Sequence, residues 1–149
     1  MTLSWSYLKK YHTNPPTIIF PRKDEVLEKY TIFKTKLINK NLSTKDYIQN
    51  NYFKKKENYI FIKNNFPYEL EDNILHFVLW FHTKFTNNSS NNFPNDLNNH
   101  EIFIKKCIKE SFKEFDNYEY IFFENNLNCR SIPDIRHVQV FMKNKINKK

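Results

Sequence analysis

The chain has 149 residues, of which 40% are hydrophobic and 17% aromatic, and its net charge is +8. This length fits one domain with an ordinary core, so we predict a single domain over residues 1–149. The chain contains no glycine, which excludes the glycine-rich phosphate loops of P-loop and dinucleotide-binding proteins. The N-terminus lacks the apolar stretch of a signal peptide and no run is long enough to span a bilayer. We therefore expect a cytoplasmic or nuclear protein with no membrane partner.

The charge and the cysteines limit the partners of the chain. A basic balance favours anionic partners such as nucleic acid. The lysines are mostly scattered, however, and cluster only at Lys54–Lys56 and in a basic tail over residues 143–149. A solvated surface with a frayed tail accounts for this pattern as well as RNA binding does. Cys107 and Cys129 are too few for a disulfide framework or a zinc site, so we expect no metal and no cofactor.

The first part of the chain has helical patterns. Residues 3–11 predict a short helix, which the Asn-Pro-Pro run at residues 14–16 ends. Apolar residues recur at steps of three and four from Asp24 to Asn39, which predicts an amphipathic helix. Ser43 with Asp46 resembles an N-cap arrangement and predicts a further helix through about residue 51.

After about residue 58, the pattern of apolar residues is that of strands rather than of helices. Residues 59–62 are β-branched and aromatic and predict a strand, and residues 66–68 form a turn-like break. Residues 74–81 are continuously apolar apart from His76, which predicts a strand buried on both faces, with a helix as the main alternative. Residues 86–99 are polar and rich in asparagine, so we expect a mobile loop there.

The last part of the chain completes a mixed fold. Apolar residues predict an amphipathic helix from Ile102 to Phe115, and residues 118–123 and 135–142 predict the last two strands. The order is helices first and then strand, strand, helix, strand, strand. We therefore predict an α+β fold with a mostly antiparallel sheet.

The last strand carries the most suggestive polar residues. Strand alternation places His137, Gln139 and Phe141 on one face and Arg136 on the other. A histidine beside an amide donor on a rigid strand suits phosphoryl chemistry, in which an imidazole attacks phosphorus and an amide stabilises the oxygens. A hydrogen-bonded histidine without a chemical role is the alternative.

Other residues could complete a site around His137. Arg130, Ser131 and Arg136 lie near it in sequence and could bind the oxygens of a ligand. His76 and His82 lie on one face if the earlier strand is regular, where they could line a pocket. They could also ligate a metal with His137, but the spacing matches no recurrent site. Trp80 could stack on a base, although core packing is its alternative role.

Two groups of segments resemble a known family. The first is Asn65 to Tyr68 with His76 to Trp80, and the second is Ile121 to Asn125 with Arg130 to Ile132 and His137 to Val140. These segments resemble the uncharacterised family typified by the fungal N-acetylglucosamine-induced proteins, which protists and large DNA viruses also contain. That family often carries His-x-His where this chain has His137 and Gln139.

A remoter resemblance, to the histidine-triad superfamily, implies a mechanism. That superfamily has a strand, a helix, a strand, a loop and then a strand bearing His-x-His-x-His or His-x-His-x-Gln. Here the resemblance implies that His137 is the nucleophile and that Gln139 takes the third position of the motif. Ile135 replaces the first histidine of the motif.

These features leave three functional hypotheses. The first is a nucleotide- or phosphoester-binding protein that could transfer or hydrolyse a phosphoryl or nucleotidyl group, with His137, Gln139 and His76 as its catalytic residues. The second is a non-catalytic module that binds RNA or a protein through its basic surface and tail. The third is a two-histidine phosphoesterase that uses His76 and His137 as acid and base. The missing Ser or Thr two residues after each histidine argues against it.

Overall fold

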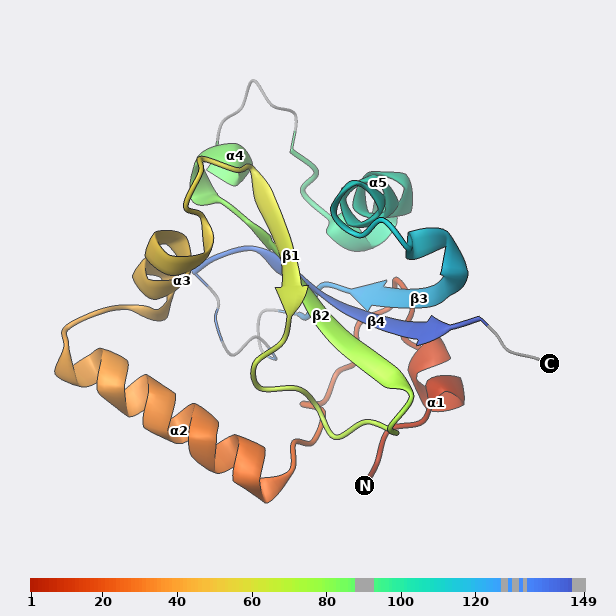
Figure 1. Ribbon diagram of the computed structural model, residues 1–149, viewed down its shortest axis with the longest axis horizontal. Helices are drawn as coiled ribbons and strands as arrows, with labels where there is room; N and C mark the ends of the chain where they lie inside the picture. The colour runs from red at the N-terminus through yellow and green to blue at the C-terminus, as the bar shows by residue number, and fades with distance from the viewer. Residues whose placement is uncertain (88–92, 127–128, 130–131, 133, 146–149) are drawn as a thin grey trace.

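The computed structural model describes residues 1–87, 93–126, 129, 132 and 134–145. Four strands form one sheet, in the order β1–β2–β4–β3, and all neighbouring strands are antiparallel (Figure 1). The α+β fold and its order of strand, strand, helix, strand, strand are therefore confirmed. The bounds of the strands are β1 Tyr59–Lys63, β2 Ile74–Phe81, β3 Tyr118–Phe123 and β4 His137–Asn144.

The N-terminal helices lie where their patterns predict them. They are α1 (Trp5–Lys9), α2 (Asp24–Asn39) and α3 (Thr44–Tyr52). The Ser43 side chain accepts a hydrogen bond from the backbone N–H of Asp46, so the predicted cap of α3 is present. The chain leaves α2 through Asn41, whose positive φ of 57° takes the place that glycine usually occupies at the end of a helix.

Several boundaries differ from the predicted ones. The helix α5 (Glu101–Ser111) ends before Phe112, which is extended and packs against Phe61 and Phe77. Ile102 is 87% exposed and is not part of the core. The short helix α4 (Thr83–Asn87) overlaps the start of the predicted loop 86–99, and a 3₁₀ helix is present at its end, over residues 97–99. Residues 88–92 lie outside the described part of the chain.

The last strand is also shifted from its predicted position. β4 begins at His137 rather than at Ile135, and it extends through Lys143 and Asn144, which belong to the predicted basic tail. Ile135 is buried just before the strand, and residues 146–149 of the tail lie outside the described residues. The strand is longer at this end because Asn144 pairs with Tyr118 at the start of β3.

The two faces of the sheet are covered differently. α5 covers one face, where its buried side chains join those of all four strands in one core cluster (Figure 1). On the other face, α1 and the N-terminal segment pack over one end of the sheet, while α3 packs over the other end. The two apolar clusters of this second face share only β2 among the strands. The cluster under α1 uses Ile74 of β2, Ile121 and Phe123 of β3 and Phe141 of β4, whereas the cluster under α3 uses Val78 and Trp80 of β2.

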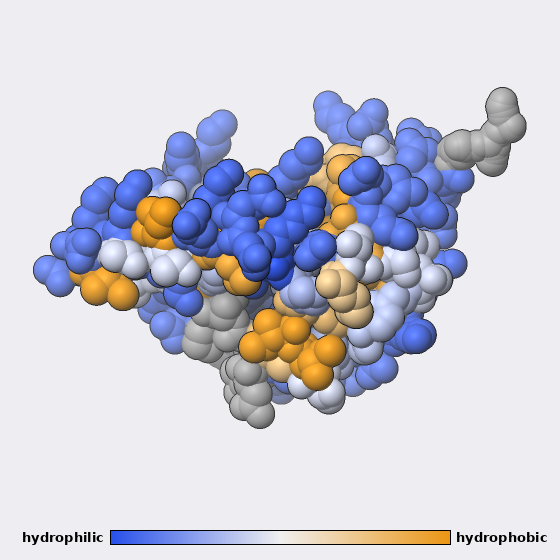
Figure 2. Space-filling model, turned by 90° about the horizontal axis from the view of Figure 1, so that it is seen from below, coloured by the Kyte–Doolittle hydropathy of each residue, from blue (hydrophilic) through white to orange (hydrophobic). Residues whose placement is uncertain are grey.

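The surface of the molecule carries scattered apolar side chains. Seen from below, it is largely hydrophilic and its apolar residues gather in separate patches (Figure 2). The large apolar residues with the most exposure include Ile18, Ile19, Ile32, Ile38 and Ile102. Small exposed apolar patches of this kind are common on protein surfaces.

Candidate functional site

Polar side chains interrupt the apolar face of the sheet between α1 and α3. His76 of β2 and His137 and Gln139 of β4 are buried there, with 5–6% of each residue exposed. The antiparallel register places all three on one face, because His76 pairs with Phe141, Val78 with Gln139 and Trp80 with His137. The predicted face of β4 is correct, since Gln139 and Phe141 lie on this side while Val138 and Val140 enter the core under α5. The buried polar group therefore has a defined place in an otherwise apolar sheet.

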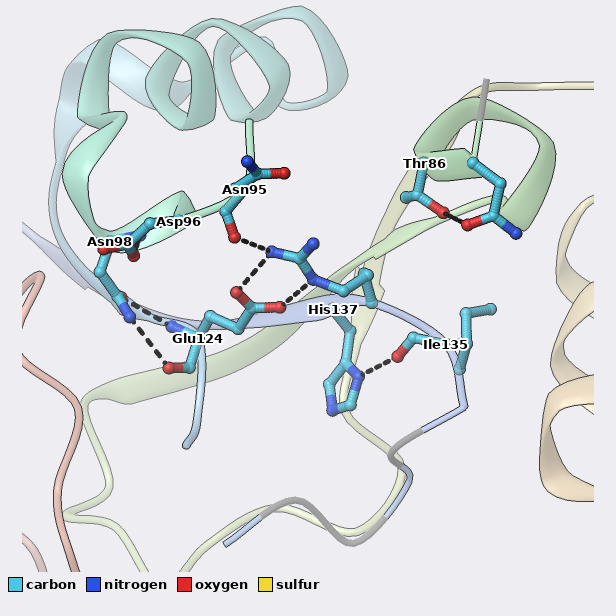
Figure 3. Close-up of polar contacts among 9 residues, drawn as sticks. Thr86, Asn95, Asp96, Asn98, Glu124, Ile135 and His137 are labelled. Carbon is cyan, nitrogen blue, oxygen red and sulfur yellow. Dashed lines mark hydrogen bonds and ion pairs between the residues drawn. The ribbon is translucent and has the colours of Figure 1, made fainter. Parts of the chain in front are cut away.

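A backbone carbonyl fixes the protonation of the His137 ring. Its Nδ1 lies 2.8 Å from the carbonyl oxygen of Ile135, and the ring points off the sheet away from β4 (Figure 3). A carbonyl only accepts, so Nδ1 carries the proton and Nε2 has the lone pair in the neutral ring. The Trp80 ring lies beside the imidazole with 4.6 Å between ring centroids. The ring thus has one orientation and one tautomer, with Nε2 as its basic nitrogen.

His76 is held just as firmly, but in the opposite tautomer. The backbone N–H of Tyr68 donates to its Nδ1 at 3.2 Å, and its Nε2 lies 2.6 Å from Oε1 of Gln139. Burial lowers the pKa of His76 from 6.5 to about 3, with a smaller contribution from the charge of Arg22 and an opposing one from Gln139. His76 is therefore a neutral, hydrogen-bonded side chain that contacts Gln139 directly.

A cleft runs along this face and includes the polar group. Its volume is about 530 Å³ when the open space at its mouth is included. His137, Gln139 and Trp80 line its floor from the sheet, while α2 and α3 supply aromatic walls. His76 contributes to a neighbouring, more open hollow rather than to this cleft. The rest of the lining includes Arg22, Tyr30, Phe33, Tyr52, Lys63, Asn64, Asn65 and Phe66.

Arg22 provides a cation to the cleft. Its Nε donates to the carbonyl oxygen of Phe66 at 2.7 Å, and its guanidinium lies 5.2 Å from the ring centroid of Tyr30 and 4.9 Å from that of Tyr68. These contacts hold the guanidinium in one place, which lowers the entropy lost when it binds an anion. Its two terminal nitrogens have no hydrogen bond to any residue within the described ranges. Arg22 was not predicted as a site residue, because it lies in the segment before α2, far from His137 in the chain.

The predicted cation Arg136 lies on the opposite side of the sheet. Its Nε is 2.5 Å from one carboxylate oxygen of Glu124, and its terminal nitrogen donates to the other oxygen at 2.8 Å. Glu124 lies on the α5 side with Asn95, whereas the His137 ring points the other way (Figure 3). Arg136 therefore forms a bidentate ion pair away from the cleft, as expected for a strand position of opposite parity to His137.

The remaining candidates fall into two groups. His82 lies beyond the end of β2, where its Nδ1 accepts from the backbone N–H of Lys84 and its ring contacts Phe53 edge-on. It does not line the cleft, because the chain leaves the strand after Phe81. Arg130 and Ser131 lie outside the described residues.

The charge around the cleft has one sign. Its described lining contains two cations, Arg22 and Lys63, and no carboxylate. Within the residues that the structure describes, no group of three His, Cys, Asp or Glu side chains is arranged to hold a metal. In the same residues, no helix combines the length and the apolar character needed to cross a bilayer. The cleft therefore offers hydrogen-bond donors and positive charge to an anionic group.

Residues 4–143 match the family described as "Protein of unknown function (DUF3605)". The chain belongs to the DUF3605 family. No curated protein matches its sequence. Among solved structures, the fold resembles the crystal structure of HTC1, with a TM-score of 0.59 and 15% sequence identity over 94% of this chain and 84% of that one. At this identity the likeness concerns the fold alone. The resemblance to a family of unknown function is thus confirmed, while the link to N-acetylglucosamine-induced proteins stays a prediction.

Proposed function

We propose that this DUF3605 protein binds a phosphorylated small molecule, most simply a nucleotide, in the cleft between the sheet and the helices α2 and α3. The observation that carries the proposal is the state of His137. Its Nδ1–H is fixed on the carbonyl of Ile135, so the basic Nε2 belongs to a ring that lines a cationic cleft. A tautomer fixed in this way is the arrangement that a histidine nucleophile or base requires.

The cleft also suits the two parts of a nucleotide. Arg22, Lys63 and Gln139 offer charge and donors to phosphate oxygens, and no described lining residue is acidic. Trp80 and Tyr52 lie close together in the cleft, with 6.2 Å between ring centroids, and such rings can contact a base. The order of strands and helix around His137 agrees with the histidine-triad resemblance of the sequence, which supports the same ligand class.

The reaction that this geometry supports is transfer or hydrolysis at phosphorus. The Nε2 lone pair of His137 attacks phosphorus, and the bond to the leaving oxygen breaks so that the leaving group departs with the electron pair. Water then attacks the phosphohistidine, the P–N bond breaks, Nε2 regains its lone pair and a proton passes to solvent. Arg22 and Gln139 stabilise the non-bridging oxygens during both steps.

Replacing His137 by asparagine tests this assignment. The probe is p-nitrophenyl thymidine 5′-phosphate, whose hydrolysis releases p-nitrophenolate and is followed by absorbance. We expect the wild type to release p-nitrophenolate and His137→Asn to fall to the uncatalysed rate, because an amide cannot attack phosphorus.

The matched control is His82→Asn, which changes a histidine outside the cleft and should leave the rate unchanged. Thermal unfolding curves of both variants are recorded to verify that each is folded. Retained release by His137→Asn, or equal loss in both variants, contradicts the role of His137.

A further inference from the structure

We propose that His76 fixes the side-chain amide of Gln139 in one orientation, with its NH₂ group toward the cleft, so that Gln139 selects an oxyanion. The selection of the ligand group rests on the function proposed above, whereas the orientation of the amide is a property of the free protein. His76 is thus a positioning residue, and Gln139 is the residue that touches the ligand.

The tautomer of His76 follows from a main-chain donor. The backbone N–H of Tyr68 can only donate, so the Nδ1 atom 3.2 Å from it must be the unprotonated nitrogen. A neutral imidazole carries one proton, which must then lie on Nε2. The ring packs against Tyr68 and Phe141, with 4.8 Å and 4.6 Å between the respective ring centroids. Turning it over would put carbon atoms in the places of Nδ1 and Nε2 and lose both hydrogen bonds. Nε2 of His76 is therefore a donor.

The orientation of the Gln139 amide follows from that donor. Nε2 of His76 is 2.6 Å from the end of the Gln139 side chain, and a donor there requires the oxygen of the amide to face it. Asn64 is also close, with its Nδ2 3.4 Å from Nε2, but its Oδ1 is committed to the backbone N–H of Phe66 at 2.7 Å. The NH₂ group of Asn64 therefore faces Nε2–H of His76, and two donors do not form a hydrogen bond. Gln139 remains the acceptor for His76.

The consequence concerns the ligand. Because its oxygen faces His76, Gln139 turns its N–H groups toward the cleft that it lines. The chain of polar groups runs from the Tyr68 backbone through His76 to the Gln139 amide and ends in a donor. Gln139 lies two residues after His137 on β4, so this donor is on the same floor of the cleft as the imidazole. A phosphate oxygen, which only accepts, satisfies this donor, whereas a ligand N–H group does not.

The free protein provides the first test. A ¹H–¹⁵N correlation spectrum that detects couplings across the imidazole ring distinguishes the two neutral tautomers. We expect His76 to be protonated at Nε2 at neutral pH, and the signal to disappear in His76→Gln, which assigns it. A His76 protonated at Nδ1 overturns the inference, whatever the protein binds.

The second test compares the binding of adenosine monophosphate with that of adenosine, which lacks the phosphate. We expect the side-chain NH₂ signals of Gln139 to shift with adenosine monophosphate and to shift much less with adenosine. Gln139→Glu should weaken binding by about tenfold or more, because a second carboxylate oxygen replaces the donor. Gln49→Glu is the matched control, since Gln49 binds Thr83 and does not line the cleft.

The outcomes separate the two proposals. Binding of adenosine monophosphate without a shift of the Gln139 signals overturns the role of Gln139 but leaves the proposed function standing. If adenosine monophosphate does not bind although His76 is protonated at Nε2, the proposed function is wrong. The positioning of Gln139 by His76 is supported in that case.

Discussion

Replacing Arg22 by methionine should weaken the binding of adenosine monophosphate by about 10-fold to 100-fold. This range corresponds to the loss of about 1.5–3 kcal/mol, which is typical of a hydrogen bond to a charged group. Methionine keeps the apolar contacts with Tyr30 and Tyr68 that the guanidinium makes, so the loss reports charge and donors rather than packing. Isothermal titration calorimetry at one fixed salt concentration measures the change.

The control for Arg22→Met removes a positive charge elsewhere. Lys106 is exposed on α5, which covers the opposite face of the sheet, so Lys106→Met changes the net charge equally. We expect this variant to bind adenosine monophosphate within about twofold of the wild type, because charges separated by more than about 10 Å are largely screened at 0.1 M salt. Equal losses in the two variants imply a general charge effect and contradict a specific anion site at Arg22.

The protein should lose about 2 kcal/mol of stability through His76 alone between pH 7 and pH 5. The pKa of this buried ring is about 3 in the folded protein, against 6.5 for an exposed histidine. Below pH 6.5 the unfolded chain binds a proton that the folded protein does not bind, so protonation favours unfolding. The stability that neutral His76 contributes is therefore fully present above pH 6.5 and is lost progressively as the pH falls toward 3.

Urea unfolding at pH 7 and at pH 5 measures this effect when the wild type is compared with His76→Gln. Glutamine does not titrate and can still donate to Gln139, so the variant should lose about 2 kcal/mol less than the wild type over this range. Other titrating groups are common to both proteins and cancel in the difference. An equal pH dependence in the two proteins shows that His76 titrates normally and contradicts its buried, neutral state.

The sequence predicted those elements that depend on local patterns. The bounds of α2 and of β3 follow from the spacing of apolar residues, and the start of α3 follows from the side chain of Ser43. The face of β4 that carries His137 and Gln139 follows from strand alternation alone. These predictions succeed because each depends on residues that are neighbours along the chain.

The site could be predicted only in part, because most of it depends on contacts between distant segments. His76 meets Gln139 through the register of β2 and β4, which the sequence does not specify. Arg22 reaches the cleft because its Nε binds the carbonyl of Phe66, and a main-chain acceptor leaves no trace in the sequence. Proximity in sequence was misleading for Arg136, since one step along a strand reverses the side of the sheet.

The most direct measurement of the central claim is the crystal structure of the protein with adenosine monophosphate. We expect the phosphate within hydrogen-bond distance of the Arg22 guanidinium and the Gln139 amide, with phosphorus facing Nε2 of His137. A phosphate bound outside this cleft, or a carbonyl or amine of the ligand in place of the phosphate at Gln139, contradicts the account.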